Sequence, residues 1–194
     1  KHKGKGHNVQ RGILASTGDY VMFMDADLAT DLAAIKTILP IIDQYDAFIG
    51  SRHCPEAKII SKQTLSRRLI SWCSRKLIKN KFHFQSLTDT QCGYKLFKNP
   101  VAKAMASHQK DDGFAFDVEY LYFLSLNGYK VKEIPVSWTD DPDSSISHPL
   151  KTSFQFYQEM KAIKKAKASY LLTNEEKKAL QKSDERTEGA EHVN

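Results

Sequence analysis

Two carboxylates stand two residues apart at the end of an apolar run. Asp25 and Asp27 follow Tyr20 to Met24, whose length and continuous apolar character are typical of a buried, parallel β-strand. Residues i and i+2 of an extended chain point to the same side, so we expect both carboxylates to face one pocket. Such hard oxygen donors suit Mg²⁺ or Mn²⁺ together with water and a diphosphate. A polar turn that caps the next helix would explain the same residues without a metal.

The Asp-x-Asp pair also occurs in a class of phosphatases, which is an alternative to a metal and diphosphate site. Haloacid-dehalogenase-type phosphatases also end an early strand in Asp-x-Asp, with the first Asp as nucleophile, here Asp25, and the second as acid and base. Their motif usually continues with x-Thr or x-Val, whereas this chain continues with Leu28-Ala29. The phosphatase is therefore the weaker alternative.

A basic segment follows later in the sequence. The stretch from Arg52 to Lys81 holds nine basic residues and one acid, whereas the whole chain has a net charge of +6. Arg52 closes a predicted strand, where a guanidinium is well placed for a bidentate phosphate contact. Arg67 and Ser71 are four residues apart on a predicted helix and share one face. The segment predicts contact with a polyanion, although a solvated basic face would carry the same charge.

Two further stretches combine acids with apolar residues. Asp89 opens the block Asp-Thr-Gln-Cys-Gly-Tyr-Lys-Leu-Phe, where an Asp in a turn is often structural. Asp117 and Glu119 interrupt an apolar helix, which indicates a buried functional acid or helix-end electrostatics.

The composition limits the class of protein that can position these residues. The chain has 194 residues and a mass of 22.1 kDa, with 41% hydrophobic and 27% charged residues. These values exclude a wholly disordered or membrane-embedded chain, and no apolar run approaches the ~20 residues of a membrane span. Three cysteines without a C-x-x-C pair indicate neither a disulfide framework nor a zinc site, and favour a reducing setting.

The apolar periodicity predicts an α/β domain over residues 1–172 and a polar, disordered tail over 173–194. Residues 1–6 are expected to form a mobile basic loop. Expected helices cover Asn8 to Ser16, Asp31 to Ile38 with Thr30 as cap, Thr64 to Lys79, Phe114 to Leu126 and Thr152 to Leu172. Expected strands cover Tyr20 to Met24, Ala47 to Gly50, Tyr94 to Phe97 and Val131 to Trp138, with a loop over Asp140 to Pro149.

Six stretches in this order resemble the family 2 glycosyltransferases that act on polyprenyl phosphates, above all those that transfer glucose or mannose to dolichyl phosphate. They are Lys3 to Gly6, Asp25 to Asp27, Gly50 to Arg52, Asp89 to Phe97, Phe116 to Tyr122 and Ile134 to Trp138. The resemblance covers about residues 1 to 160. It implies a GT-A, Rossmann-like fold and inverting transfer of a hexose from UDP-glucose or GDP-mannose to a polyprenyl or dolichyl phosphate. The family's first strand precedes the Lys-Gly-Lys-Gly loop, so the chain is expected to lack its first βα units.

The resemblance also implies roles for individual residues. Lys5, Asp25 and Asp27 match the donor site, where the two acids hold Mg²⁺ or Mn²⁺ and Asp27 is catalytic. Asp89 matches an acid near the reacting centre, and Arg52, Arg67 and Ser71 match residues that hold the acceptor phosphate.

The expected location is the cytosolic face of a membrane, where the basic segment meets an anionic lipid surface. A nucleic-acid-binding module is the third alternative, since it would explain the charge. It would need aromatic residues interleaved on an exposed face, whereas the aromatics of this chain lie mostly in apolar runs. We therefore expect no nucleic acid partner.

Overall fold

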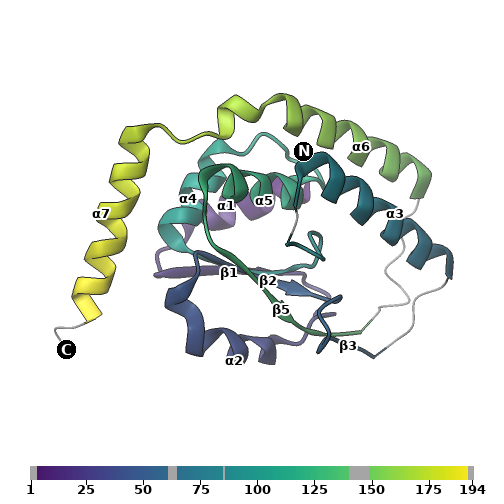
Figure 1. The fold of residues 1–194 in the computed structure, drawn as a ribbon, viewed down its shortest axis with the longest axis horizontal. Coiled ribbons are helices and arrows are strands. Elements are labelled where there is room, and N and C mark those ends of the chain that lie inside the picture. Colours follow the sequence, from purple (N-terminus) through teal and green to yellow (C-terminus); the bar gives the residue numbers. More distant parts are fainter. Residues whose placement is uncertain (1–3, 61–64, 85, 140–148, 192–194) are drawn as a thin grey trace.

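The computed structural model describes residues 4–60, 65–84, 86–139 and 149–191. A four-stranded sheet lies at its centre (Figure 1). Its strands follow the order β1-β4-β2-β5. These strands span Tyr20–Met24 (β1), Tyr94–Lys98 (β4), Ala47–Ser51 (β2) and Val131–Pro135 (β5). A small parallel sheet joins β3 (Lys58–Ile59) to β6 (Ser137–Trp138). The predicted strand Val131 to Trp138 is thus divided between two sheets at Val136.

The strand directions bring three chemistry-bearing segments to one edge of the sheet. β4 runs antiparallel to β1 and to β2, whereas β2 and β5 are parallel. The carboxyl ends of β1 and β2 therefore lie beside the amino end of β4. The prediction that β1 is a buried parallel strand is wrong for the described residues, because β1 is half-buried there and pairs antiparallel with β4. An apolar run alone does not distinguish these two cases.

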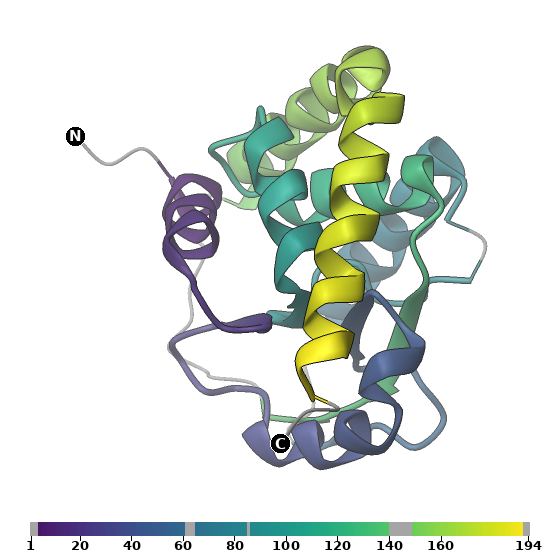
Figure 2. The ribbon, with the colours of Figure 1, turned by 90° about the vertical axis from the view of Figure 1, so that its left-hand side faces the viewer.

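Helices cover both faces of this sheet (Figures 1 and 2). The larger core packs α1 (Lys5–Ala15), α4 (Asn99–His108), α5 (Phe116–Asn127), α6 (Pro149–Lys165) and the end of α3 (Leu65–Phe82) against one face. The other face packs on the short α2 (Ile35–Ile38), between the 3₁₀ turns η1 (Leu32–Ala34) and η2 (Leu39–Gln44). Ala47 and Ile49 belong to the larger core and Phe48 to the smaller one, as the alternation of a strand requires.

Two predicted helix starts differ in the structure. The cap before η1 is Asp31 rather than Thr30, since the carboxylate of Asp31 accepts the backbone N–H of Ala33 at 2.8 Å. Helix α1 begins at Lys5, inside the predicted mobile loop.

Within the described ranges, no helix is long and apolar enough to cross a membrane.

The chain beyond residue 172 also differs from its prediction as a disordered tail. It forms α7 (Asn174–Glu191), which follows the 3₁₀ turn η3 (Lys167–Tyr170). Thr173 and Glu176 make a capping box, because the Thr173 hydroxyl accepts the backbone N–H of Glu176 at 3.2 Å and the Glu176 carboxylate accepts the backbone N–H of Thr173 at 2.8 Å. The Thr-x-x-Glu spacing was the signal for this helix. A domain boundary at residue 172 remains a prediction.

Candidate active site

Asp25 lies where β1 ends, in contact with two segments that the sequence keeps far apart. Its carboxylate forms an ion pair with the Lys5 ammonium, and its backbone N–H donates to the Gly93 carbonyl at 2.9 Å. A Cβ at Gly93 would overlap the carboxylate of Asp25. The glycine in the block Asp89 to Phe97 therefore allows the start of β4 to approach Asp25 this closely.

Gly4 determines where Lys5 lies. It precedes α1 with φ 111°, a conformation that favours glycine, and a Cβ there would overlap the carbonyl of Asp112. The next glycine, Gly6, donates its N–H to the Gly113 carbonyl at 3.1 Å. The first turn of α1 is thus held against the loop before α5, and this contact directs Lys5 toward Asp25.

Asp27 belongs to a turn and not to an extension of the strand. It is exposed, and its Oδ1 accepts the backbone N–H of Ala29 at 3.0 Å. The extended geometry from which we expected Asp25 and Asp27 to point the same way ends at Met24. The turn closes through Leu28, which has φ 53° and is 73% exposed. A leucine in this conformation costs free energy, as is common at functional sites.

Arg52 and Asp89 form a bidentate ion pair at the end of β2. Nε of Arg52 donates to Oδ2 of Asp89 at 2.7 Å, and an Nη nitrogen donates to Oδ1 at 3.0 Å. Burial alone would raise the pKa of Asp89, but the hydrogen bonds and charge of Arg52 outweigh burial and lower it to about 2. Burial would lower the pKa of Arg52, but Asp89 raises it above its ordinary range. The Trp138 ring, whose centroid is 5.4 Å from the guanidinium carbon, covers the arginine.

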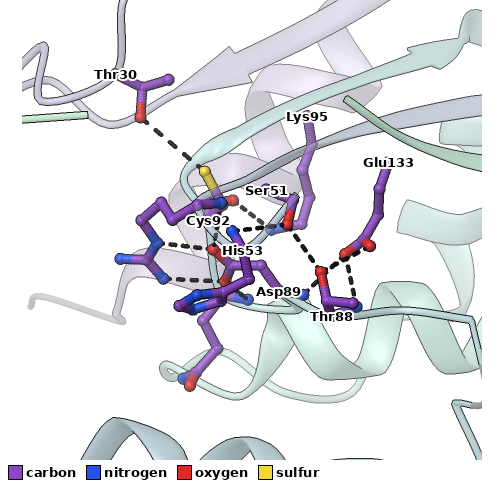
Figure 3. Close-up of polar contacts among 10 residues, drawn as sticks. Thr30, Ser51, His53, Thr88, Asp89, Cys92, Lys95 and Glu133 are labelled. Carbon is purple, nitrogen blue, oxygen red and sulfur yellow. Dashed lines mark hydrogen bonds and ion pairs between the residues drawn. The ribbon is translucent and has the colours of Figure 1, made fainter. Parts of the chain in front are cut away.

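Glu133 on β5 holds the turn that carries Asp89, and sequence reasoning missed it (Figure 3). Its Oε1 accepts the backbone N–H groups of Thr88 and Asp89, both at 2.8 Å, and its Oε2 accepts the Thr88 hydroxyl at 2.9 Å. Ser51 lies 2.9 Å from the same hydroxyl. The acid in Val-Lys-Glu-Ile-Pro, near the end of a predicted strand, was the available signal.

A second buried ion pair lies beneath this edge. Lys95, which is fully buried, donates to Asp117 Oδ1 at 2.5 Å and to the Cys92 carbonyl at 2.7 Å. Glu119 accepts the backbone N–H of Asp111 at 3.0 Å and the Tyr170 hydroxyl at 2.5 Å. The two acids of α5 are therefore buried, as the sequence suggested, and both have structural partners.

The helix α3 carries the remaining predicted residues. Ser71 is half-buried on the helix face that also includes Arg75 and the buried Ile78. The side chain of Arg67 lies outside the described part of the structure, so its predicted place beside Ser71 is untested. The loop of residues 140–148 also lies outside it. The structure thus brings Lys5 to Asp25 and Arg52 to Asp89 at one edge of the sheet.

The sheet order and the solved structures give the chain a GT-A-like glycosyltransferase fold. Its structure is similar to glucosyl-3-phosphoglycerate synthase from Mycobacterium tuberculosis in complex with UDP, with a TM-score of 0.57, 12% identity, and coverage of 83% of this chain and 55% of that one. The family model of glycosyl transferase family 2 matches residues 1–105, and the chain belongs to this family. This assignment favours the glycosyltransferase hypothesis over the phosphatase and the nucleic-acid-binding module.

Two relatives of this chain are named as dolichyl-phosphate β-glucosyltransferases. The chain is 31% identical to a dolichyl-phosphate β-glucosyltransferase of Dictyostelium discoideum over 170 residues, which are 84% of this chain and 51% of that protein. It is 30% identical to the human dolichyl-phosphate β-glucosyltransferase over 160 residues, 75% of this chain and 47% of that protein. The chain therefore spans about half the length of these relatives.

Proposed function

We propose that the chain belongs to an enzyme that transfers glucose from UDP-glucose to a dolichyl or other polyprenyl phosphate, with inversion at the anomeric carbon. The observation that carries this proposal is the similarity to two dolichyl-phosphate β-glucosyltransferases across most of the chain. The edge where β1, β2 and β4 meet supports it, because ligands of open α/β sheets bind outside the carboxyl ends of the strands. GDP-mannose is the alternative donor.

The donor half of the site consists of Lys5, Asp25 and Asp27. The charge of Asp25 is balanced by Lys5, whereas the exposed Asp27 has an oxygen, Oδ2, with no hydrogen bond to another described residue. Within the described ranges no three His, Cys, Asp or Glu side chains form a metal cluster. The donor set still fits Mg²⁺ or Mn²⁺, because Mg²⁺ is typically held by one or two carboxylates and substrate phosphates. Asp27 would hold the ion, which would stabilise charge on the departing diphosphate.

The acceptor half consists of Arg52, Arg67 and Ser71. A phosphate monoester has its second pKa near 6, so most of the acceptor is already a dianionic nucleophile at neutral pH. A carboxylate with a pKa of about 2 is a poor base, which favours Asp89 as the residue that orients Arg52. Arg52 retains N–H groups outside its pair with Asp89, and these are available to the acceptor phosphate.

The exposed face of α3 is suited to a membrane surface. Four of its apolar residues are between 42% and 62% exposed, namely Leu69, Ile70, Trp72 and Leu77. Basic residues flank them on the same helix, and this combination is typical of helices that lie in the headgroup region of anionic membranes. We propose a peripheral position on the cytosolic face.

The test is a transfer assay with the chain and with the full-length protein, using labelled UDP-glucose or GDP-mannose and a polyprenyl phosphate. Turnover of UDP-glucose is expected, and EDTA should abolish it. Asp27→Asn should also abolish turnover while leaving the fold intact, because the amide oxygen can still accept the Ala29 N–H. Full activity of this variant, or of the protein in EDTA, would contradict the proposal. Arg67→Ala should raise the acceptor Michaelis constant about tenfold or more, with the donor constant little changed.

A further inference from the structure

A pocket of about 200 Å³ lies between α3 and the turn that precedes β4. Three basic residues of α3 line it together with two hydroxyls of the turn and one aromatic ring, namely Arg75, Lys76, Lys79, Thr88, Thr90 and Trp72. Of the proposed acceptor residues whose side chains the structure describes, neither Arg52 nor Ser71 lines it. The pocket is therefore distinct from the proposed active site, although it lies on the same helix.

Thr90 supplies an unmatched hydrogen-bonding group to this pocket. The residue is 5% exposed, and its hydroxyl makes no hydrogen bond to the described residues. A buried hydroxyl without a partner is unfavourable and is rare in native structures. Its neighbours differ in this respect, since Thr88 bonds to Glu133 and Asp89 to Arg52. An oxygen-bearing ligand in the pocket would satisfy Thr90.

The charge of the pocket indicates that this ligand is negatively charged. In the part of the chain that the structure describes, no carboxylate lies within ion-pair distance of Arg75, Lys76 or Lys79. Burial lowers the pKa of Arg75, the charge of Asp89 opposes this only in part, and the charge of Arg52 lowers the pKa further. An anion beside Arg75 would relieve this cost. Asp89 is not a full counter-ion for Arg75, because both of its carboxylate oxygens already accept hydrogen bonds from Arg52.

We propose that this pocket binds a phosphate group through Arg75, Lys79 and the Thr90 hydroxyl, independently of the acceptor phosphate. Phosphate oxygens accept hydrogen bonds from guanidinium, ammonium and hydroxyl donors at once, as the lining requires. The phosphate belongs to a lipid headgroup or is free in solution. Trp72 lines the pocket, is 48% exposed, and has the Lys76 ammonium 4.3 Å from its ring centroid. A tryptophan that is both exposed and next to a cation suits the interfacial depth of a lipid headgroup.

The test measures the thermal midpoint of the chain against inorganic phosphate at constant ionic strength. Phosphate should raise the midpoint, and Thr90→Val and Arg75→Gln should each weaken the apparent affinity about tenfold. Thr90→Val removes a hydroxyl without a protein partner, so without phosphate its midpoint should equal or exceed that of the parent. Lys36→Gln is the matched charge control, because Lys36 is exposed on the remote helix α2.

Sedimentation with phosphatidylcholine vesicles, with and without phosphatidic acid, distinguishes the two sources. Binding that requires phosphatidic acid, competes with inorganic phosphate and weakens in Thr90→Val assigns the pocket to a headgroup. Phosphate binding without this lipid dependence assigns it to free phosphate. Phosphate binding that survives both Thr90→Val and Arg75→Gln, or that is lost instead in Ser71→Ala, overturns the proposal. This readout does not depend on sugar transfer, so its failure leaves the proposed function standing.

Discussion

The carboxylate of Glu133 accepts the backbone N–H of Asp89 at 2.8 Å, from a strand 44 residues further along the chain. Because the same oxygen accepts the N–H of Thr88, one side chain on β5 fixes the turn that presents Asp89 to Arg52. The position of the Arg52 guanidinium therefore depends on Glu133 through Asp89, although the described hydrogen bonds of Glu133 go to Thr88 and Asp89 and not to Arg52.

Replacing this acid should loosen the turn. Glu133→Ala leaves two backbone N–H groups without their acceptor, which should lower the free energy of unfolding by about 2 kcal/mol. Sugar transfer should fall more than stability alone explains, with partial rescue in Glu133→Gln, whose amide oxygen can still accept. Urea denaturation and the transfer assay measure the two effects. Glu56→Ala, at an exposed position, is the control, and an equal loss there would contradict the role of Glu133.

The Arg52–Asp89 pair should make stability depend on acid. The folded pKa of Asp89, about 2, lies below its unfolded value of about 3.9, so its contribution is present above about pH 4 and is lost as the pH falls through about 2. Full protonation should remove about 2 kcal/mol. Urea denaturation between these pH values measures the decline. Asp89→Asn should flatten it, and an unchanged slope in that variant would assign the acid sensitivity elsewhere.

The sequence predicted the strands and the residues at their ends. It did not predict which residues pair with one another across the sheet. The runs that became β1, β2 and β4 are short and apolar, and turn residues bound them, so their positions follow from local pattern. The pairing of Asp25 with Lys5, and of Arg52 with Asp89, depends on the antiparallel placement of β4 between β1 and β2. Apolar periodicity does not encode that sheet order.

Some helices were likewise predicted from the sequence, and α7 was missed. The helix expected over Thr64 to Lys79 corresponds to α3, because a period of 3.6 residues is a local signal. In contrast, the capping box of Thr173 and Glu176 was overlooked, because the polar composition after residue 172 outweighed a two-residue signal. Glu133 gave only a weak signal of its role, since a single acid near the end of a strand has many explanations.

Asp111 should produce the opposite dependence on pH. Burial, with the nearby charges of Glu159 and Glu119, raises its pKa to about 7. The folded state then binds a proton more tightly than the unfolded state, so stability should increase as the pH falls through about 7. Because Asp111 is partly exposed, the change should be on the order of 1 kcal/mol. Asp111→Asn should be more stable than the parent at about pH 8 and similar at about pH 5, with the exposed Asp19→Asn as control.

Two glycines provide a matched test of the close approach between β4 and Asp25. A Cβ at Gly93 would overlap the Asp25 carboxylate, whereas one at Gly12, on α1, would meet nothing within 4 Å. Gly93→Ala should therefore force Asp25 away from Lys5 and cost about 1 to 3 kcal/mol, the usual range for overpacking. Gly12→Ala should stabilise the chain by about 0.5 to 1 kcal/mol, because alanine favours a helix interior.

Function should separate these two variants more sharply than stability does. Gly93→Ala should lose affinity for UDP-glucose, since it displaces a residue of the proposed donor site, while the acceptor Michaelis constant should change little. Gly12→Ala should keep both constants. Urea denaturation and Michaelis constants for each substrate provide the measurements. If Gly93→Ala raised the acceptor constant alone, Asp25 would face the acceptor, and the proposed division of the edge into a donor half and an acceptor half would have to be reversed.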